Sequence, residues 1–307
     1  MQRRNFVKNT AILSSGLLLG KGLLASENYE APSQYITILH TNDVHSRIDP
    51  FPMDGGRNQG MGGVAGRAEL VKKIRSEVKH VILLDAGDIF QGTPYFNLYK
   101  GEPEMLAMQA MGYDACTLGN HDFDAGMENF VTQLQKTEMA LINCNYGFAG
   151  TPFESIYTPY KIINKGGIKI GILGVGIELH GLVPESLYGN TIYNNPITSA
   201  NATANMLKKE KGCNLIVCLS HLGYKYADNK ISDQVLAKES EYIDLIIGGH
   251  THTFLPAPEV HTNKQGSTVL INQVGWGGIQ LGRLDFEFSK KKGNNFLKSS
   301  TLPIKKK

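Results

Sequence analysis

Five short apolar runs in this 307-residue chain are each followed directly by side chains that can bind a metal ion. The polar segments after the runs are His40-Thr41-Asn42-Asp43-Val44-His45, Asp85-Ala86-Gly87-Asp88, Gly119-Asn120-His121-Asp122, Ser220-His221 and Gly248-Gly249-His250-Thr251-His252. In a parallel α/β sheet, the C-terminal ends of the strands lie along one edge, where ligands bind. The sequence therefore predicts that five segments, far apart along the chain, converge on a single site.

The apolar runs alternate with stretches of helical periodicity. The expected strands are 35–39, 81–84, 115–118, 140–143, 168–175, 215–219 and 242–247. Between them, apolar residues in 64–78, and later Met105, Met108 and Met111, recur at the spacing of one helix face. The order strand, helix, strand predicts an α/β fold with a largely parallel sheet covered by helices. Residues 279–288 alternate between apolar and polar, which predicts an exposed antiparallel strand.

The composition restricts the kind of protein. Hydrophobic residues make up 41% of the chain and charged residues 19%, which provides a core and excludes a disordered chain. The formal net charge of +3 owes much to residues 1–26, which carry four basic residues and no acidic one. Because the rest of the chain is close to neutral, we expect no nucleic acid as a partner.

Residues 1–26 have the pattern of a secretory signal peptide, with a cationic start, an apolar middle and a polar end. The paired arginines Arg3 and Arg4, followed by Phe6 and Lys8, resemble the bacterial twin-arginine signal, which exports folded proteins. We therefore expect a periplasmic or secreted protein with no stable membrane anchor after signal removal. The alternative, an uncleaved anchor, is disfavoured because the apolar run is interrupted and is shorter than the roughly 20 residues that span a membrane.

The expected division of the chain has three parts. After the signal peptide, residues 27–290 would form one α/β domain, and residues 291–307 a lysine-rich C-terminal tail. The tail is interpreted as a solvated end of the chain, and the alternative is a polybasic binding site.

The residue types at the predicted site indicate a borderline divalent metal. Asp43 and His45 are two residues apart, as are His250 and His252, so each pair points to one side in extended backbone. Imidazole, carboxylate and amide ligands without thiolate suit zinc, manganese, iron or cobalt. The candidate ligands are Asp43, His45, Asp88, Asn120, His221, His250 and His252. Seven groups are too many for one tetrahedral ion, but they fit two ions that share a bridging carboxylate.

Each of these motifs, taken alone, also has a structural interpretation. An isolated Asp-x-His or His-Thr-His segment is often a surface turn, and Gly-Asn-His-Asp after a strand can be a tight turn with an Asx cap. The presence of all five segments, each directly after a strand, favours the metal site.

In order and spacing, the five segments resemble the signature blocks of the calcineurin-like metallophosphoesterases. The segments 41–45, 88–93 and 120–124, together with Gly62-Gly63-Val64-Ala65-Gly66-Arg67, are more narrowly similar to the N-terminal domain of the 5′-nucleotidase and UDP-sugar hydrolase branch. The similarity covers nearly all of residues 34–288. It implies a four-layer αββα sandwich with the metal site at the C-terminal strand ends.

The resemblance also implies how two metal ions are held. Asp43, His45, Asp88 and His252 would bind one ion, and Asp88, Asn120, His221 and His250 the other. Asp88 would then bridge the two ions. Position 252 varies within this branch between an amide and an imidazole.

A histidine outside the ligand set is expected to act in catalysis. By the resemblance, His121 and Asp124 face the leaving group, where a protonated His121 stabilises phosphoryl oxygens or protonates the departing alkoxide. The alternative is that Asp124 caps a helix that begins near Gly126. Asp122, His40 and Asp85 are expected to orient ligands or to cap turns.

The expected function is hydrolysis of phosphate monoesters, above all 5′-nucleotides, by attack of a metal-bridging hydroxide. Two alternatives remain open. One is hydrolysis of another bond on the same centre, such as a UDP-sugar pyrophosphate, a 2′,3′-cyclic nucleotide or a thiosulfate ester. The other is a metal-binding subunit that needs a separate recognition partner. Members of this branch usually continue into a domain that recognises the nucleotide, so we expect a separately encoded nucleotidase C-terminal domain or a less selective reaction.

Overall fold

The computed structural model describes residues 33–289 and 293–305. The described residues all belong to one compact unit, Ser33–Lys307. The signal peptide expected at residues 1–26 lies outside the described residues. Within those described ranges, no helix combines the length and the apolar character needed to cross a membrane.

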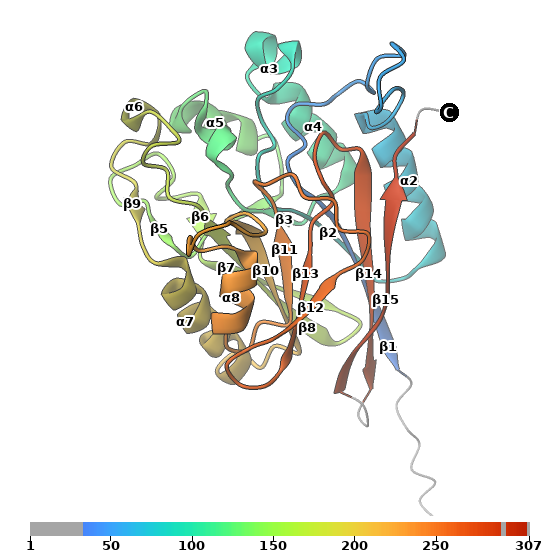
Figure 1. Cartoon of the computed structure of the whole chain (residues 1–307), viewed down its shortest axis with the longest axis vertical. Coiled ribbons are helices and arrows are strands. Elements are labelled where there is room, and N and C mark those ends of the chain that lie inside the picture. Colours follow the sequence, from blue (N-terminus) through green and yellow to red (C-terminus); the bar gives the residue numbers. More distant parts are fainter. Residues whose placement is uncertain (1–32, 290–292, 306–307) are drawn as a thin grey trace, which may run out of the picture. The chain divides into compact units, whose positions relative to one another are not determined.

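Two large sheets and one small sheet form the framework (Figure 1). The first sheet has the order β15 (Gly293–Pro303), β14 (Gln280–Ser289), β1 (Gln34–Thr41), β2 (Val81–Asp85), β3 (Ala115–Cys116), β4 (Ala140–Ile142) and β6 (Tyr157–Thr158). The second has the order β12 (Glu259–Thr262), β13 (Thr268–Asn272), β11 (Leu245–Gly248), β10 (Leu215–His221), β8 (Ile168–Gly176) and β7 (Tyr160–Lys165). The small sheet pairs β5 (Tyr146–Gly147) with β9 (Ile192–Tyr193).

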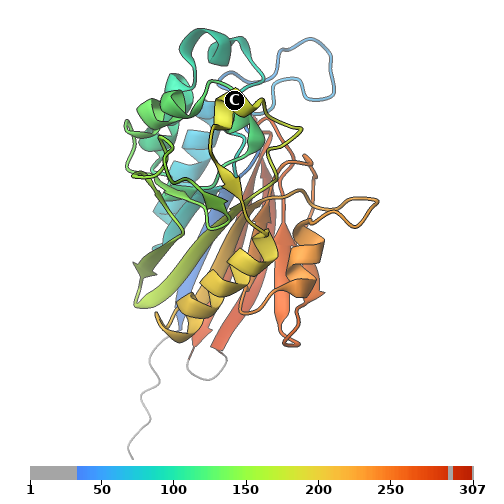
Figure 2. The ribbon, with the colours of Figure 1, turned by 90° about the vertical axis from the view of Figure 1, so that its left-hand side faces the viewer.

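Helices flank the two large sheets. The helices are α2 (Val64–Glu77), α3 (Pro94–Tyr99), α4 (Glu102–Met111), the 3-10 helix η1 (Asn120–Phe123), α5 (Met127–Leu134), α6 (Glu185–Tyr188), α7 (Pro196–Lys209) and α8 (Asp233–Glu239). Helices α2, α4 and α5 pack on the first sheet, and α7 and α8 pack on the second (Figure 2).

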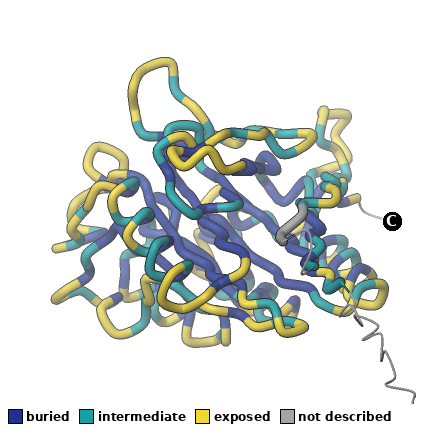
Figure 3. Tube along the Cα trace, turned by 90° about the horizontal axis from the view of Figure 1, so that it is seen from below, coloured by how far each residue is buried: buried dark blue, intermediate teal, exposed yellow. Residues whose placement is uncertain are grey.

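Three apolar cores separate four layers. Ile36 and Ile38 of β1 point into the core between the two sheets, whereas Leu39 points toward the helices that cover the first sheet. This alternation follows from the two-residue period of a strand. The central strands β2, β10 and β11 are accordingly buried on both faces, whereas exposed residues gather in the helices, the loops and edge strands such as β7 and β12 (Figure 3). The layers are helix, sheet, sheet and helix, which confirms the predicted four-layer α/β sandwich.

The predicted parallel core is present. Strands β1, β2, β3 and β4 are parallel neighbours, as are β8, β10, β11 and β13. The predicted helical stretches form α2 and α4.

The prediction for the end of the chain is wrong in two respects. Strand β14 is antiparallel to β1 as expected, but it is mostly buried rather than exposed. The reason is that residues 293–303, predicted to belong to a solvated tail, form β15 and cover its outer edge. Ile304 is also buried, so the apolar residues among the lysines hold this segment on the sheet.

We expect His40 to make the stability of this fold depend on pH. Its ring lies fully buried in β1, with Nε2 2.9 Å from Asn272 Nδ2, and burial lowers its pKa to about 3. Between about pH 6.5 and pH 3 the unfolded chain binds a proton there and the folded chain does not, so stability falls on acidification. We expect His40→Gln to remove about 2 kcal/mol of the stability difference between pH 7 and pH 5, measured by urea unfolding with a chelator.

The control for this measurement is His180→Gln, which changes an exposed histidine. It should keep the pH dependence of the native chain. An unchanged difference between pH 7 and pH 5 in His40→Gln would contradict the role assigned to His40, whatever the absolute stability of the variant.

Candidate metal centre

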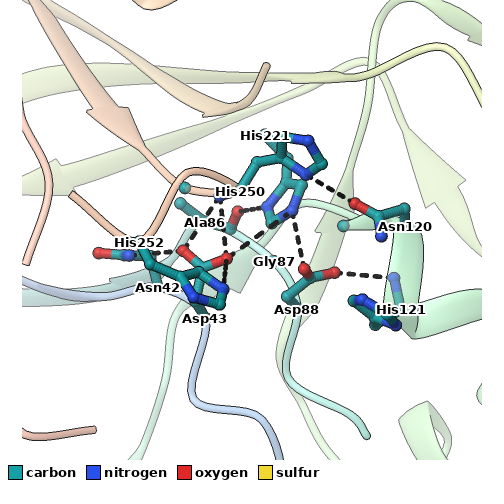
Figure 4. A network of polar contacts seen from close by, with 12 residues as sticks. Asn42, Asp43, Ala86, Gly87, Asp88, Asn120, His121, His221, His250 and His252 are labelled. Atoms are coloured by element: carbon teal, nitrogen blue, oxygen red, sulfur yellow. Dashed lines mark hydrogen bonds and ion pairs between the residues drawn. The ribbon is translucent and has the colours of Figure 1, made fainter. Parts of the chain in front are cut away.

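The predicted ligand segments meet at one edge of the two sheets (Figure 4). Asp43 and His45 follow β1, Asp88 follows β2, and Asn120 begins η1 after β3. From the second sheet, His221 ends β10, and His250 and His252 follow β11. The expected convergence on one site is therefore present, and both sheets contribute to it.

The first group of ligand atoms comes from Asp43, His45 and His252. These atoms lie within 4.8 Å of one another. His252 Nε2 is 3.5 Å from Asp43 Oδ1, and His45 Nε2 is only 2.9 Å from His252 Nε2. Two ring nitrogens that face each other at this distance can both direct their lone pairs at a cation. The other nitrogen of His45, Nδ1, lies 3.2 Å from the carbonyl oxygen of Phe90, which orients the ring.

The second group comes from Asp88, His221 and His250, whose ligand atoms also lie within 4.8 Å of one another. His250 Nδ1 is 2.8 Å from Asn120 Oδ1, which adds the amide to this group. Asp88 Oδ2 lies 3.1 Å from His221 Nε2 and 3.8 Å from His45 Nε2. Asp88 therefore stands between the two groups, where a bridging carboxylate has to be.

Five of the seven candidate ligands have left-handed backbone conformations. Their φ angles are 49° for Asp43, 51° for His45, 55° for Asp88, 74° for His250 and 54° for His252. Such angles are uncommon for residues other than glycine, and they cluster at functional sites. Neighbouring backbone holds them in place, because the N–H groups of Asp43 and His45 donate to the carbonyl oxygens of Gly87 and Asp88.

Burial shifts the pKa values of several candidate ligands toward their uncharged forms. Burial raises the pKa of Asp43 to about 8 and lowers that of His250 to about 3 and that of His252 to about 4. Neutral imidazole is the form that binds a metal. Burial would lower the pKa of His221 too, but the charges of Asp88 and Asp43 raise it to about 10.

The surroundings of His221 show most directly whether these residues can hold metal ions. Its Nδ1 lies 2.7 Å from the carbonyl oxygen of Ala86, while its buried Nε2 faces Asp88 Oδ2 at 3.1 Å and Asp43 Oδ1 at 3.9 Å. A buried ring nitrogen that is oriented from behind by a carbonyl oxygen and faces two buried carboxylates has the surroundings of a metal ligand. The residues present therefore fit two divalent cations.

A sequence profile of calcineurin-like phosphoesterases matches residues 36–254. The chain belongs to this family. The family membership implies divalent metal ions, in agreement with the two groups of ligand atoms.

Known proteins similar to this chain include 5′-nucleotidases. A snake venom 5′-nucleotidase from Gloydius brevicauda is 35% identical over 301 residues, which cover 91% of this chain and 49% of the venom protein. Among solved structures, a 5′-nucleotidase precursor from Thermus thermophilus has a TM-score of 0.79 at 30% identity, covering 89% of this chain and 55% of that one. The NAD nucleotidase of Haemophilus influenzae has a TM-score of 0.77 at 25% identity, covering 90% and 51%. The chain thus spans about half the length of the curated relatives it matches.

His121 and Asp124 lie beside the candidate metal centre. His121 Nδ1 is 2.8 Å from Asp124 Oδ2, and this hydrogen bond raises the pKa of His121. The His121 ring packs edge-on to the His45 ring at 5.4 Å, and its side chain is 39% exposed. Asp124 is the C-terminal cap residue of η1, whereas the N-cap position of α5 is Gly126 and α5 has no side-chain cap hydrogen bond, so Asp124 is not the N-cap of α5.

The three residues expected to support the ligands differ in what they contact. Asp122 accepts hydrogen bonds from the backbone N–H groups of Asp88, Ile89 and Gly119, which fixes the turn that carries Asp88. Asp85 accepts from the Gly87 N–H and so supports the same turn. His40 instead lies between the sheets beside Asn272, and it contacts no candidate ligand by hydrogen bond.

Sequence reasoning missed two neighbours of the site. Asn42 donates from Nδ2 to Asp43 Oδ2 at 2.6 Å. Trp276 stacks on His252, with ring centroids 5.8 Å apart and planes 13° from parallel. Trp276 lies in a glycine-rich turn outside all the ligand segments. This turn has neither helix nor strand periodicity, so the sequence pattern did not indicate Trp276 as a site residue. It is the only tryptophan in the chain.

We predict that Asp88→Asn reduces the bound metal from two equivalents to fewer than about one, because Asp88 stands between both groups. Asparagine tolerates the left-handed backbone of residue 88 and can still accept the His121 N–H, so the change isolates the carboxylate charge. Elemental analysis measures the metal content. The exposed Asp228→Asn is the matched control and should retain both ions, whereas full metal content in Asp88→Asn would refute the bridging role.

Proposed function

We propose that this chain is a dinuclear metal-dependent phosphoesterase that hydrolyses phosphate monoesters, above all 5′-nucleotides. The observation that carries the proposal is the meeting of two ligand groups around Asp88, with the His121–Asp124 pair beside them. Zinc, manganese, iron and cobalt all suit these ligands.

The seven ligands have defined tasks in this proposal. Asp43, His45 and His252 would hold one ion, and Asn120, His221 and His250 would hold the other, with Asp88 placed between the two groups. Bound divalent ions supply Lewis-acid polarisation of a phosphoryl group and lower the pKa of water. The protein orients the ligands through their second nitrogens, as the contacts of His45 with Phe90 and of His221 with Ala86 illustrate.

His121 acts on the substrate rather than on an ion. Asp124 holds Nδ1, which leaves Nε2 to face the ester, and the hydrogen bond to Asp124 raises the pKa of His121 and so favours its protonated form. A protonated imidazole there donates a hydrogen bond to phosphoryl oxygens and can transfer its proton to the leaving oxygen. The exposed position of the ring gives it access to a substrate that enters from solvent.

The choice of a nucleotide as substrate rests on the named 5′-nucleotidase relatives. Because those proteins are about twice as long as the aligned region, we propose that a nucleotidase C-terminal domain acts together with residues 27–290 and increases activity. We also propose export of the folded chain to the periplasm through its twin-arginine segment. The loading of metal before export agrees with the deep burial of Asp43, Asp88 and His221.

One alternative reaction is supported by a structural relative. The NAD nucleotidase of Haemophilus influenzae shares this fold at 25% identity, so a pyrophosphate bond is a second candidate for cleavage on the same centre. Cyclic nucleotides and a thiosulfate ester are further candidates, and a substrate panel distinguishes all of them.

We predict that His121→Ala lowers kcat by roughly 10² to 10⁴ and leaves two metal equivalents bound, because His121 acts on the reacting ester and holds no ion. Asp124→Asn should lower kcat less. The double variant should be no slower than His121→Ala, since the two side chains act as a unit. Loss of a full metal equivalent from His121→Ala would show instead that His121 is a ligand.

We predict metal-dependent release of phosphate from p-nitrophenyl phosphate and from AMP with manganese, zinc or cobalt, and none with a chelator. The values of kcat/KM for purine and pyrimidine 5′-monophosphates should agree within about tenfold, or 1.4 kcal/mol, for the chain alone. Addition of a nucleotidase C-terminal domain should raise activity and selectivity. Turnover without metal, or on no ester in the panel, would contradict the proposed function.

A further inference from the structure

A pocket next to the candidate metal centre has a composition that suits an aromatic ring. Its volume is about 380 Å³, within the range of small-molecule sites. The residues that line it include Arg57, Asn58, Met61, Phe254, Trp276 and Gln280. We propose that this cavity, here called the Trp276 pocket, binds the base of a nucleotide whose phosphate lies at the metal centre. The inference rests on the proposed function.

Two segments of backbone, residues 252–254 and 274–277, connect the Trp276 pocket to the candidate metal centre. Trp276 stacks on His252, and Phe254 follows His252 by two residues. Phe254 forms an antiparallel bridge with Val274, and the Gly277 N–H donates to the carbonyl oxygen of Asp43 at 2.7 Å. The pocket wall is therefore fixed relative to the ligands Asp43 and His252. The half-exposed His252 ring, stacked on Trp276, lies between the candidate metal ligands and the pocket.

Two aromatic rings in the pocket can stack on a base. The Phe254 ring packs against Gly275, where even a Cβ atom would collide with the ring, and Phe254 remains 44% exposed. Phe51 holds Trp276 by an edge-to-face contact with ring centroids 5.4 Å apart. Stacking accepts every base, because each base has a π face. This pocket would therefore add affinity for a nucleotide without a strong preference among nucleotides.

Polar groups in the pocket can reach the edge of a base. The side-chain oxygen of Gln280 is buried and has no hydrogen-bond partner among the described residues, a costly state that an N–H donor of a ligand would relieve. Asn58 adds an amide with both donor and acceptor atoms. Arg57 is exposed and makes no ion pair within residues 33–289 and 293–305, so its guanidinium is available to stack or to donate.

The loop that contributes Arg57, Asn58 and Met61 to the pocket is also held by backbone contacts. Gly62 N–H donates to the Ile304 carbonyl oxygen, and Met61 bridges Lys305, so the loop that carries Arg57 is tied to the end of β15. Phe51 N–H donates to the Met61 carbonyl oxygen, which closes the loop on itself. A pocket built on fixed backbone loses little conformational entropy when a ligand binds.

The test uses nucleosides, which carry a base but no phosphoester. The native chain is titrated with adenosine and with uridine, and the fluorescence of its only tryptophan, Trp276, is followed. We expect a saturable change with both nucleosides and none with ribose or inorganic phosphate. Calorimetry that detects no binding of either nucleoside would overturn the proposal.

Matched variants show whether stacking is responsible. Phe254→Leu keeps an apolar side chain without a π face and should weaken adenosine binding about tenfold, whereas Phe254→Tyr should retain it. Leu98→Ala, at an exposed residue of α3, is the control and should bind like the native chain. In kinetics, Phe254→Leu should lower the ratio of kcat/KM for AMP to kcat/KM for glycerol 3-phosphate about tenfold, which a general loss of structure would not do.

The two proposals fail separately in this design. Nucleoside binding without hydrolysis of any ester would refute the proposed function and keep the pocket. Hydrolysis of AMP with no nucleoside binding, and with an unchanged substrate ratio in Phe254→Leu, would refute the pocket and keep the function.

Discussion

Two carboxylates, Asp43 and Asp88, lie almost completely buried where the two sheets meet, and the surrounding structure responds to their charge. A buried carboxylate is costly unless positive charge or hydrogen-bond donors compensate for it. The protein supplies part of this compensation through the backbone N–H groups of His250 and His121, which donate to Asp43 and Asp88 respectively. The buried His221 supplies a further part, and cations would complete it. The same imbalance that makes the site costly makes it a place for metal ions.

The backbone at this edge is held in an unfavourable conformation by the sheets below it. Each left-handed ligand residue costs about 1 kcal/mol relative to ordinary backbone. The left-handed conformations persist because β1, β2, β10 and β11 are buried on both faces and cannot move without opening an apolar core. Ions that bind only the folded state would in turn stabilise it. The rigid strands therefore determine the geometry of the ligands.

Much of the fold and the ligand set could be predicted from the sequence, because strands of a parallel sheet repeat a local pattern and present their ends together. Asp43, Asp88 and His221 each follow an apolar run, so their convergence needed no knowledge of packing. It could not be predicted that residues 293–303 form a strand. They pair with the outer edge of β14, and this edge exists only after the rest of the sheet has assembled. Trp276 was missed for a related reason. It belongs to no periodic segment, and its contact with His252 arises from the bridge between Phe254 and Val274.

The first strand of the domain lies between two strands that are remote from each other along the chain. On one side β1 pairs with β2, and on the other Gln34 pairs with Phe288. A ribosome releases the second partner only after nearly the whole domain has been synthesised, so one edge of β1 stays open until then. Such long-range pairing slows folding and exposes intermediates to aggregation. Completion of the sheet thus comes late, and any cellular route that moves this protein already folded must wait for the pairing of β14 with β1.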